Sequence, residues 1–408
     1  MDAFSSVSAT SAAWLRDSVF APFVHAYVEH LTSRRYAPGT TRAYLGCVAH
    51  FAHWCRRRSL DLGDLQGPLR GFVQEHLPYC DCARRVQTDP RQVRAALSHL
   101  LTVLACHGVS TVAGPVCATD SVLQRFDEHL EQARGLAAST RHSRLKIARS
   151  LLLRTSSATP SASELRQFIA GELARVSTAS GASLAGALRS YLRFRAFEGD
   201  LVDHLLPVIA SPARWRLAPL PQTLSASELD QLLNAFPLNL PSRLRAFAIV
   251  RCLVDLGLRS SEAINLNLDD VDWTAGTLCV AHGKSRRADV LPLPESTGRA
   301  IAEYLRSERP KTTSRRVFVR HVAPVDHPVG ADVVRNTVRA AYLRGGLPYT
   351  RVHILRHTLA SRILATGGTL KEVADVLRHR ELNTSMIYAK VDQTRLAAVA
   401  MPWPGSPA

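Results

Sequence analysis

The sequence predicts a mainly α-helical protein with a small β-hairpin or sheet, organised as two N-terminal helical modules followed by an α+β domain. Most of the 408 residues fall in stretches whose apolar side chains recur every three to four positions, as they do on amphipathic helices. The region on both sides of Gly283 instead alternates apolar and polar residues, as a β-hairpin does. A proline-rich segment over residues 207–222 resists both helix and sheet, so it predicts a linker before the last domain.

Residues 1–113 are expected to form the first helical module. Two amphipathic stretches within residues 23–58 are separated by the sequence APGT, a helix breaker in which Thr40 is placed to cap the second helix. A further apolar helix over residues 89–108 ends at Gly108, a residue that suits the end of a helix.

Residues 118–206 repeat this outline, and we expect a second, weakly similar helical module in tandem with the first. An apolar helix, a basic turn and another helix precede Ser161 and Glu164, whose spacing is that of a capping box and predicts a new helix start. Basic residues lie at the turns of both modules, where they face either a polyanion or ordinary solvent.

The third domain is predicted over residues 223–400, followed by a short tail over residues 401–408. It opens on a second capping box, SASE from residue 225, and a glycine turn interrupts its first helices. Lys284 is expected at the tip of the hairpin. Further helices are predicted over residues 296–307, 331–344, 353–366 and 370–378.

The charge balance favours a polyanionic partner. Lysine and arginine number 51 against 34 acidic residues, and the forked donors of arginine suit phosphate oxygens, which favours nucleic acid. No segment reaches 18 consecutive apolar residues, which predicts no membrane span. The N-terminus has an acid at position 2 and no basic-then-apolar order, so we expect no secretory signal and a cytoplasmic location.

The eight cysteines form no C-x-x-C pair. His76, Cys80 and Cys82 come close together in HLPYCDC, but they lack the usual spacing of zinc ligands. The sequence therefore predicts reduced, mostly buried thiols and no metal site.

Six polar residues of the last domain fit one chemical task, although each alone is explained by a helix cap, a turn or a surface pair. Two arginines that converge on one point are unfavourable unless an anion lies between them, and together they suit the charge of a pentavalent phosphate. A phenol is able to form a phosphodiester, and a lysine or histidine is able to move the protons. The six are Arg259, Lys284, His353, Arg356, His379 and Tyr388.

The motifs that carry these residues resemble those of the tyrosine recombinases, the phage integrase family, which includes XerC/XerD-like site-specific recombinases. DLGLRSSEAINL resembles the family's first arginine box, with Arg259 as the catalytic arginine and Glu262 as a supporting acid. HGKSRRADVLPL resembles the family's hairpin with its catalytic lysine, here Lys284.

The two remaining boxes follow in the family's order. HILRHTLASRILATGG resembles the His-x-x-Arg box with His353 and Arg356, and His357 is the adjoining supporting histidine. LRHRELNTSMIYAK resembles the box with the third histidine, His379, which is followed nine residues later by the nucleophile, Tyr388. One position departs from the pattern: Arg378 stands where the family usually has glycine, so it is strained if the backbone adopts positive φ.

The resemblance implies a site-specific recombinase or integrase of a mobile element, which clamps double-stranded DNA and exchanges strands through a Holliday junction. Tyr388 would attack the scissile phosphate and form a 3′-phosphotyrosine link, while Arg259 and Arg356 would neutralise the non-bridging oxygens and Lys284 would protonate the leaving oxygen. His353 would assist proton transfer from the phenol, and His379 would bind the phosphate. The bond energy stays in the covalent link, so neither metal, ATP nor another cofactor is expected.

The resemblance also implies that residues 118–206 are the family's helical core-binding, SAM-like domain, and that residues 1–113 are an extra DNA-contacting module. Strand exchange requires four protomers, so a homotetramer on DNA is expected, alone or with sister recombinases, in a bacterial, nucleoid-associated setting. The tail with Trp403 suits docking onto a neighbouring subunit and packing on its own domain equally well.

Three other functions compete with this interpretation. The first is a non-catalytic relative that only holds DNA, and the intact set of catalytic residues argues against it. The second is a type IB topoisomerase-like enzyme that relaxes supercoils, and the two helical modules favour site-specific binding instead. The third is an RNA-binding protein, but the sequence shows no platform of stacking aromatic residues.

Overall fold

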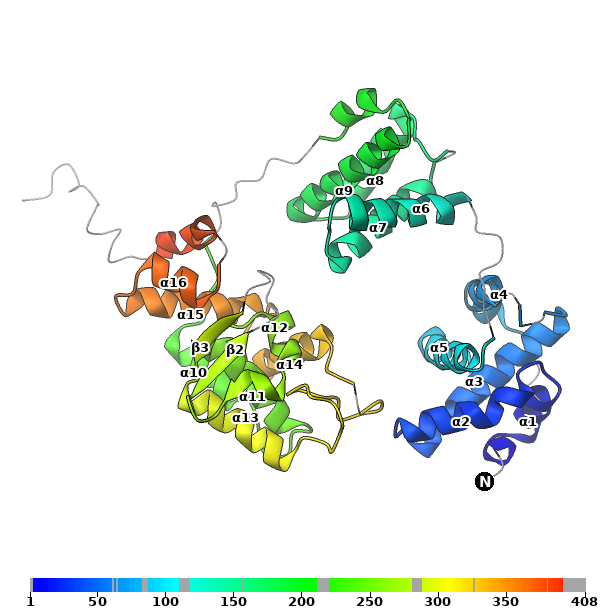
Figure 1. Cartoon of the computed structure of the whole chain (residues 1–408), viewed down its shortest axis with the longest axis horizontal. Helices are drawn as coiled ribbons and strands as arrows, with labels where there is room; N and C mark the ends of the chain where they lie inside the picture. The colour runs from blue at the N-terminus through cyan, green and yellow to red at the C-terminus, as the bar shows by residue number, and fades with distance from the viewer. Residues whose placement is uncertain are drawn as a thin grey trace, which may run out of the picture.

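The computed structural model in Figure 1 contains three bodies that follow one another along the chain. Buried hydrophobic side chains form one cluster within residues 15–104, a second within residues 122–209, and two clusters in the third body. The structure describes residues 3–60, 62–63, 65–82, 87–109, 118–155, 157–210, 220–280, 288–325, 327–379 and 381–391.

The first body is helical, with α3 packed against α1 and α5. Its helices are α1 (Ala9–Arg16), α2 (Val24–Ser33), α3 (Pro38–Arg57), α4 (Gln66–Gly71) and α5 (Pro90–Cys106). Proline at the first position of α3 has its φ preset for a helix and needs no backbone donor, so Ala37 is the N-cap. The prediction that Thr40 caps this helix was therefore wrong. Gly108 follows α5 with a φ of +74°, as predicted for a helix end.

In the second body α7 packs against α6 and α9. The described helices are α6 (Ala118–Glu128), α7 (Ala138–Leu152), α8 (Ala162–Leu173) and α9 (Thr178–Phe197). The predicted capping box starts α8: the Glu164 N–H donates to Ser161 Oγ at 3.2 Å, and the Glu164 carboxylate accepts the Ser161 N–H at 2.8 Å. A 3-10 helix over Asp203–Val208 and the buried Ile209 extend this body into the segment that was predicted as linker.

The third body combines helices with an antiparallel sheet whose described strands have the order β1–β2–β3. β2 and β3 are the two arms of the predicted hairpin, with Leu278 opposite Leu291. Its tip, including Lys284, lies outside the described residues. The elements are α10 (Ala226–Asn234), α11 (Arg243–Asp255), α12 (Ser260–Asn265), β1 (Val271–Asp272), β2 (Thr277–Val280), β3 (Asp289–Pro292), α13 (Glu295–Ser307), α14 (Ala331–Arg344), α15 (His353–Ala365) and α16 (Leu370–Val376).

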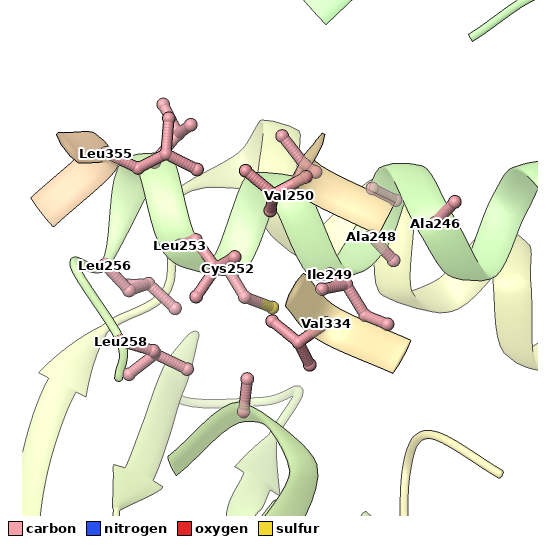
Figure 2. Packing of buried hydrophobic residues seen from close by; sticks show 14 of the residues in the cluster. Ala246, Ala248, Ile249, Val250, Cys252, Leu253, Leu256, Leu258, Val334 and Leu355 are labelled. Atoms are coloured by element: carbon pink, nitrogen blue, oxygen red, sulfur yellow. The ribbon is translucent and has the colours of Figure 1, made fainter. Parts of the chain in front are cut away.

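The core of the third body surrounds α11, which packs against α13, α14 and α15. Its sequence RLRAFAIVRCLVD places apolar residues around most of the helix because neighbours cover it on several sides. Figure 2 shows Ile249 and Cys252 of α11 beside Val334 of α14. Core residues lie on both sides of Gly257, at Leu256 and Leu258, so the start of α12 is packed against this core.

A smaller hydrophobic cluster joins the last elements of the third body. It consists of Ala360 and Leu364 from α15, Val373 and Leu377 at α16, and Tyr388 from a 3-10 helix that runs from residue 382 to 391. α15 and α16 lie side by side in Figure 1. The predominance of helix and the one small sheet among the described residues confirm the predicted fold class. Among the described helices, none has both the length and the apolarity that a membrane crossing demands.

Candidate active site

Five of the six residues predicted to act on a phosphate lie in the described part of the third body, and the sixth, Lys284, lies outside it. They come from the start of α12, the first turn of α15, the end of α16 and the last 3-10 helix. In chain order they are Arg259, His353, Arg356, His379 and Tyr388.

A tight turn at Gly257 lies between α11 and α12 and contacts the elements that carry these residues. Its φ of +56° lies in the left-handed region, and an added Cβ would lie 2.8 Å from Leu377 Cδ2 and 2.9 Å from Leu359 Cδ2, so glycine is required on two counts. The Gly257 carbonyl accepts hydrogen bonds from Arg356 and, at 3.4 Å, from Arg378. The turn therefore holds two guanidinium groups on one backbone oxygen.

Glu262, the predicted supporting acid, joins two arginines. Its side chain is fully buried, and one carboxylate oxygen accepts a hydrogen bond from the Arg259 guanidinium at 2.5 Å. The other oxygen accepts from the Arg259 backbone N–H and from the Arg378 guanidinium, both at 2.8 Å. Burial acts to raise the pKa of Glu262, but Arg378 and the donors of Arg259 outweigh it and hold the pKa below its ordinary value. Glu262 is therefore ionised, and it orients both arginines.

Arg378 has a φ of +54°, which confirms that the position usually occupied by glycine requires a left-handed backbone here too. Its buried guanidinium donates to the carbonyls of Val376, Leu256 and Gly257 in addition to Glu262. The sequence indicated that an arginine at this position is strained if φ is positive. It gave no sign that this arginine brings a third guanidinium group to the site.

Arg356 is 6% exposed and donates to the carbonyls of Gly257 and Leu377. Within the described residues it forms no salt bridge with a carboxylate. Burial, followed by the charges of Arg259 and Arg378, lowers its pKa to about 9. Three guanidinium groups around one carboxylate leave a positive excess, which a bound anion would neutralise.

Tyr388 is 2% exposed and packs into the smaller hydrophobic cluster. Its hydroxyl lies 2.9 Å from Nδ1 of His357, and the ring of His379 is parallel to its own, with 6.4 Å between the centroids. Burial raises the pKa of Tyr388, whereas the charges of Arg356 and Arg259 act to lower it. The field of both arginines therefore reaches the phenol.

His353 and His357 occupy the same face of α15 but have different surroundings. His353 is the exposed first residue of the helix, and no hydrogen bond among the described residues links it to Tyr388. Partial desolvation, followed by the charges of Arg356 and Arg259, lowers the pKa of His353. His357, by contrast, contacts the hydroxyl of the predicted nucleophile directly, a contact that its predicted supporting role did not include.

His379 is held by Ser385, whose hydroxyl lies 2.6 Å from its Nδ1. Burial, followed by the charges of Arg356, Arg259 and Arg378, lowers the pKa of His379 to about 4, so the imidazole is neutral near pH 7. The fully buried Ser385 was not predicted, because a serine in the sequence LNTSM carries no local signal of this contact.

Comparisons with known proteins agree on one family. A family model described as "Phage integrase family" matches residues 222–395. The protein y4rA of Sinorhizobium fredii, named as an integrase/recombinase, is 34% identical over 395 residues, which cover 94% of this chain and 94% of that protein.

Two solved structures share the fold. The XerH site-specific recombinase, bound to a palindromic difH substrate, aligns over 84% of this chain and 97% of its own, with a TM-score of 0.55 and 19% identity. A lambda integrase tetramer bound to a Holliday junction aligns over 71% of this chain and 88% of its own, with a TM-score of 0.51 and 15% identity.

Proposed function

Because the chain belongs to the phage integrase family, whose members break and rejoin DNA, we propose that it is a site-specific recombinase in which Tyr388 is the nucleophile. One observation carries the assignment of the site. The charges of Arg259 and Arg356 reach a phenol that is hydrogen-bonded to His357 and lies against His379, on elements that the family model covers. The partner is double-stranded DNA, whose phosphates match the positive excess of the site.

In the proposed reaction, the phenol oxygen of Tyr388 attacks the scissile phosphorus in line with the 5′-oxygen. A new P–O bond to the tyrosine forms as the bond to the 5′-oxygen breaks, which gives a 3′-phosphotyrosine and a free 5′-hydroxyl. Arg259 and Arg356 neutralise the non-bridging oxygens, and Lys284 is the proposed proton donor to the leaving oxygen. One phosphodiester replaces another of similar energy, so the cycle requires neither ATP nor a metal ion.

The geometry favours His357 as the group that receives the phenol proton, because its Nδ1 lies 2.9 Å from the hydroxyl. His353 and His379 then bind the phosphate from the side of the arginines. Tyr388 is only 2% exposed, and a DNA duplex cannot enter a protein core, so the phenol must become accessible before attack, by a shift of the 3-10 helix that keeps the hydroxyl next to His357. The described arrangement is therefore the resting state of the enzyme.

Exchange of strands between two duplexes needs four active sites, so the proposal includes a homotetramer on DNA, with or without sister recombinases. The lambda integrase tetramer bound to a Holliday junction shows that this fold supports such an assembly in that protein. The first and second bodies, residues 1–113 and 118–206, are proposed to contact the DNA on either side of the cleavage point.

Covalent capture of DNA by the full chain tests the nucleophile. The wild type, Tyr388→Phe and Tyr349→Phe are incubated with a library of nicked random-sequence duplexes, and adducts that survive denaturation are recovered and sequenced. Tyr349→Phe is the matched control, because its hydroxyl binds Glu228 of α10 at 2.9 Å. We expect adducts from the wild type and the control and none from Tyr388→Phe, with duplex affinity kept within a few-fold. Adducts from Tyr388→Phe would show that the assignment is wrong.

The recovered sequence then separates the alternative functions. A relative that only binds DNA yields affinity without adducts, and a topoisomerase-like enzyme relaxes a supercoiled plasmid without producing recombinants between two plasmids that carry the site. If the clamp neutralises about 6–10 phosphates, the affinity falls by about 10³- to 10⁵-fold between about 50 and 200 mM salt. An affinity that is insensitive to salt would contradict the clamp.

A further inference from the structure

The first body gathers four side chains that are able to bind a metal ion, far along the chain from the recombination residues. His50, His76, Cys80 and Cys82 each offer one ligand atom, and these atoms all lie within 4.8 Å of one another. The last three stand together in the sequence, where their spacing predicted reduced thiols and no metal site. The fold supplies His50 from the middle of α3, 26 residues before His76.

Three of the six distances within this cluster match the edges of a tetrahedral zinc site, and all six are within 4.8 Å. Nε2 of His50 lies 3.1 Å from Nε2 of His76, Sγ of Cys80 lies 3.3 Å from the His50 nitrogen, and Sγ of Cys82 lies 3.5 Å from the His76 nitrogen. Around a tetrahedral zinc ion, bonds of about 2.0–2.1 Å to nitrogen and about 2.3 Å to sulfur set two nitrogens about 3.3 Å apart and a nitrogen and a sulfur about 3.6 Å apart. The observed edges agree with these values to within about 0.3 Å.

The orientation of the imidazoles also suits a metal. Nδ1 of His50 lies 3.2 Å from the carbonyl oxygen of Gln87, to which it donates, so the lone pair of Nε2 faces the cluster. A backbone carbonyl on the outer nitrogen is the usual support of a metal-binding histidine. The ring of His76 stacks on Phe72 with 5.3 Å between the centroids, which directs its Nε2 to the same point.

We propose that His50, His76, Cys80 and Cys82 bind one zinc ion. Two thiolates and two imidazoles favour zinc over magnesium or calcium, which prefer oxygen ligands. Four protein ligands leave no open position for a substrate, so the role is structural. The ion ties the short π-helix Phe72–His76 and the segment after it to the fully buried His50 of α3. A zinc ion that binds only the folded form stabilises it, so the first body should be more stable with the ion bound.

Metal analysis of the full chain tests the proposal. The protein is produced in zinc-supplemented medium and purified without metal-affinity chromatography, and its metals are measured by mass spectrometry. We expect about one zinc per chain in the wild type and in Cys106→Ser, the control with an exposed thiol outside the cluster. Cys80→Ser and Cys82→Ser lose most of this zinc. Zinc content equal to the wild type in both variants would overturn the proposal.

A second measurement uses only the wild type, because loss of the ion can unfold the first body in the variants. Exchange of zinc for Co²⁺ should give the visible absorption of tetrahedral, thiolate-bound cobalt. Titration with a thiol reagent should release the ion in step with modification of Cys80 and Cys82 and not with that of Cys106. A wild type that takes up neither zinc nor Co²⁺, or a freshly prepared chain with a Cys80–Cys82 disulfide, would overturn the proposal and leave a hydrogen-bonded cluster.

Discussion

Arg378 allows backbone strain to be compared with the contacts of a buried charge, because alanine removes the guanidinium and keeps the strain, whereas glycine removes both. A left-handed φ, here +54°, disfavours a residue with a Cβ by about 1–2 kcal/mol relative to glycine. Against this strain, the Arg378 guanidinium binds the fully buried carboxylate of Glu262 at 2.8 Å. The two substitutions therefore separate the two effects.

The magnitude follows from what Glu262 retains after the substitution. Removal of one partner of a buried pair costs about 3–5 kcal/mol when the other charge is left uncompensated. Glu262 keeps the guanidinium and the backbone N–H of Arg259, so the lower limit applies. Arg378→Ala should therefore lower the free energy of unfolding by about 3 kcal/mol. In Arg378→Gly, strain relief of about 1–2 kcal/mol offsets part of this loss and leaves a destabilisation of about 1–2 kcal/mol.

The assay must report on the third body alone, because a melting curve of the whole chain would mix the transitions of three bodies. Hydrogen–deuterium exchange of the full chain, followed by mass spectrometry on peptides from α11, reports the free energy of unfolding of this core. Arg362→Ala serves as the control, because this exposed arginine of the same body should change stability by less than about 0.5 kcal/mol.

Two results would refute the reasoning. If Arg378→Gly is as stable as the wild type, the stabilisation by the bridge to Glu262 only offsets the backbone strain of the arginine. If the alanine and glycine variants have equal stability, the left-handed backbone stores no strain.

Three further predictions concern the same body. Gly257→Ala should destabilise it more than Gly276→Ala, in the same exchange assay, because both glycines have positive φ but only Gly257 has side-chain atoms within 3 Å of an added Cβ; equal losses would contradict the close packing. A double-mutant cycle of His357→Ala and Tyr388→Phe should give a coupling of about 0.5–1.5 kcal/mol, the range for one hydrogen bond, and a value of zero would remove His357 from this contact. Stability should fall as the pH drops from 6.5 to about 4, because the unfolded chain takes up protons at histidines whose folded pKa values are lowered to about 4, among them His321. A His321→Gln variant should show a shallower decline over this range, and an unchanged profile would contradict that assignment.

Helix starts could be predicted from the sequence wherever a local signal determined them. The capping boxes at Ser161 and Ser225 are both present, since their hydrogen bonds span only three residues. Thr40 was misassigned because Pro38, two positions earlier, is the stronger signal for a helix start. β1 was missed because two residues are too few to show an alternation.

The site could be predicted as a set of residues but not as a set of contacts. Motif order identified Arg259, Arg356 and Tyr388, and in the structure the charges of both arginines act on the phenol, while their catalytic roles stay predictions. The bridge between Arg378 and Glu262 spans 116 residues, and nothing local indicates that these two side chains meet. The same reason concealed His50, which becomes a neighbour of Cys80 only through folding.

If Tyr388 is the nucleophile, as we propose, its burial separates finding DNA from cutting it. A chain whose phenol is enclosed by apolar side chains would then travel along a chromosome without leaving nicks behind. The work of freeing the hydroxyl has to come from the interaction with a matching sequence, so an incorrect sequence is rejected at the opening step even when it is held tightly. Fidelity then depends on how firmly one side chain is retained, and a substitution that loosens it would produce an enzyme that cleaves more readily and at more places.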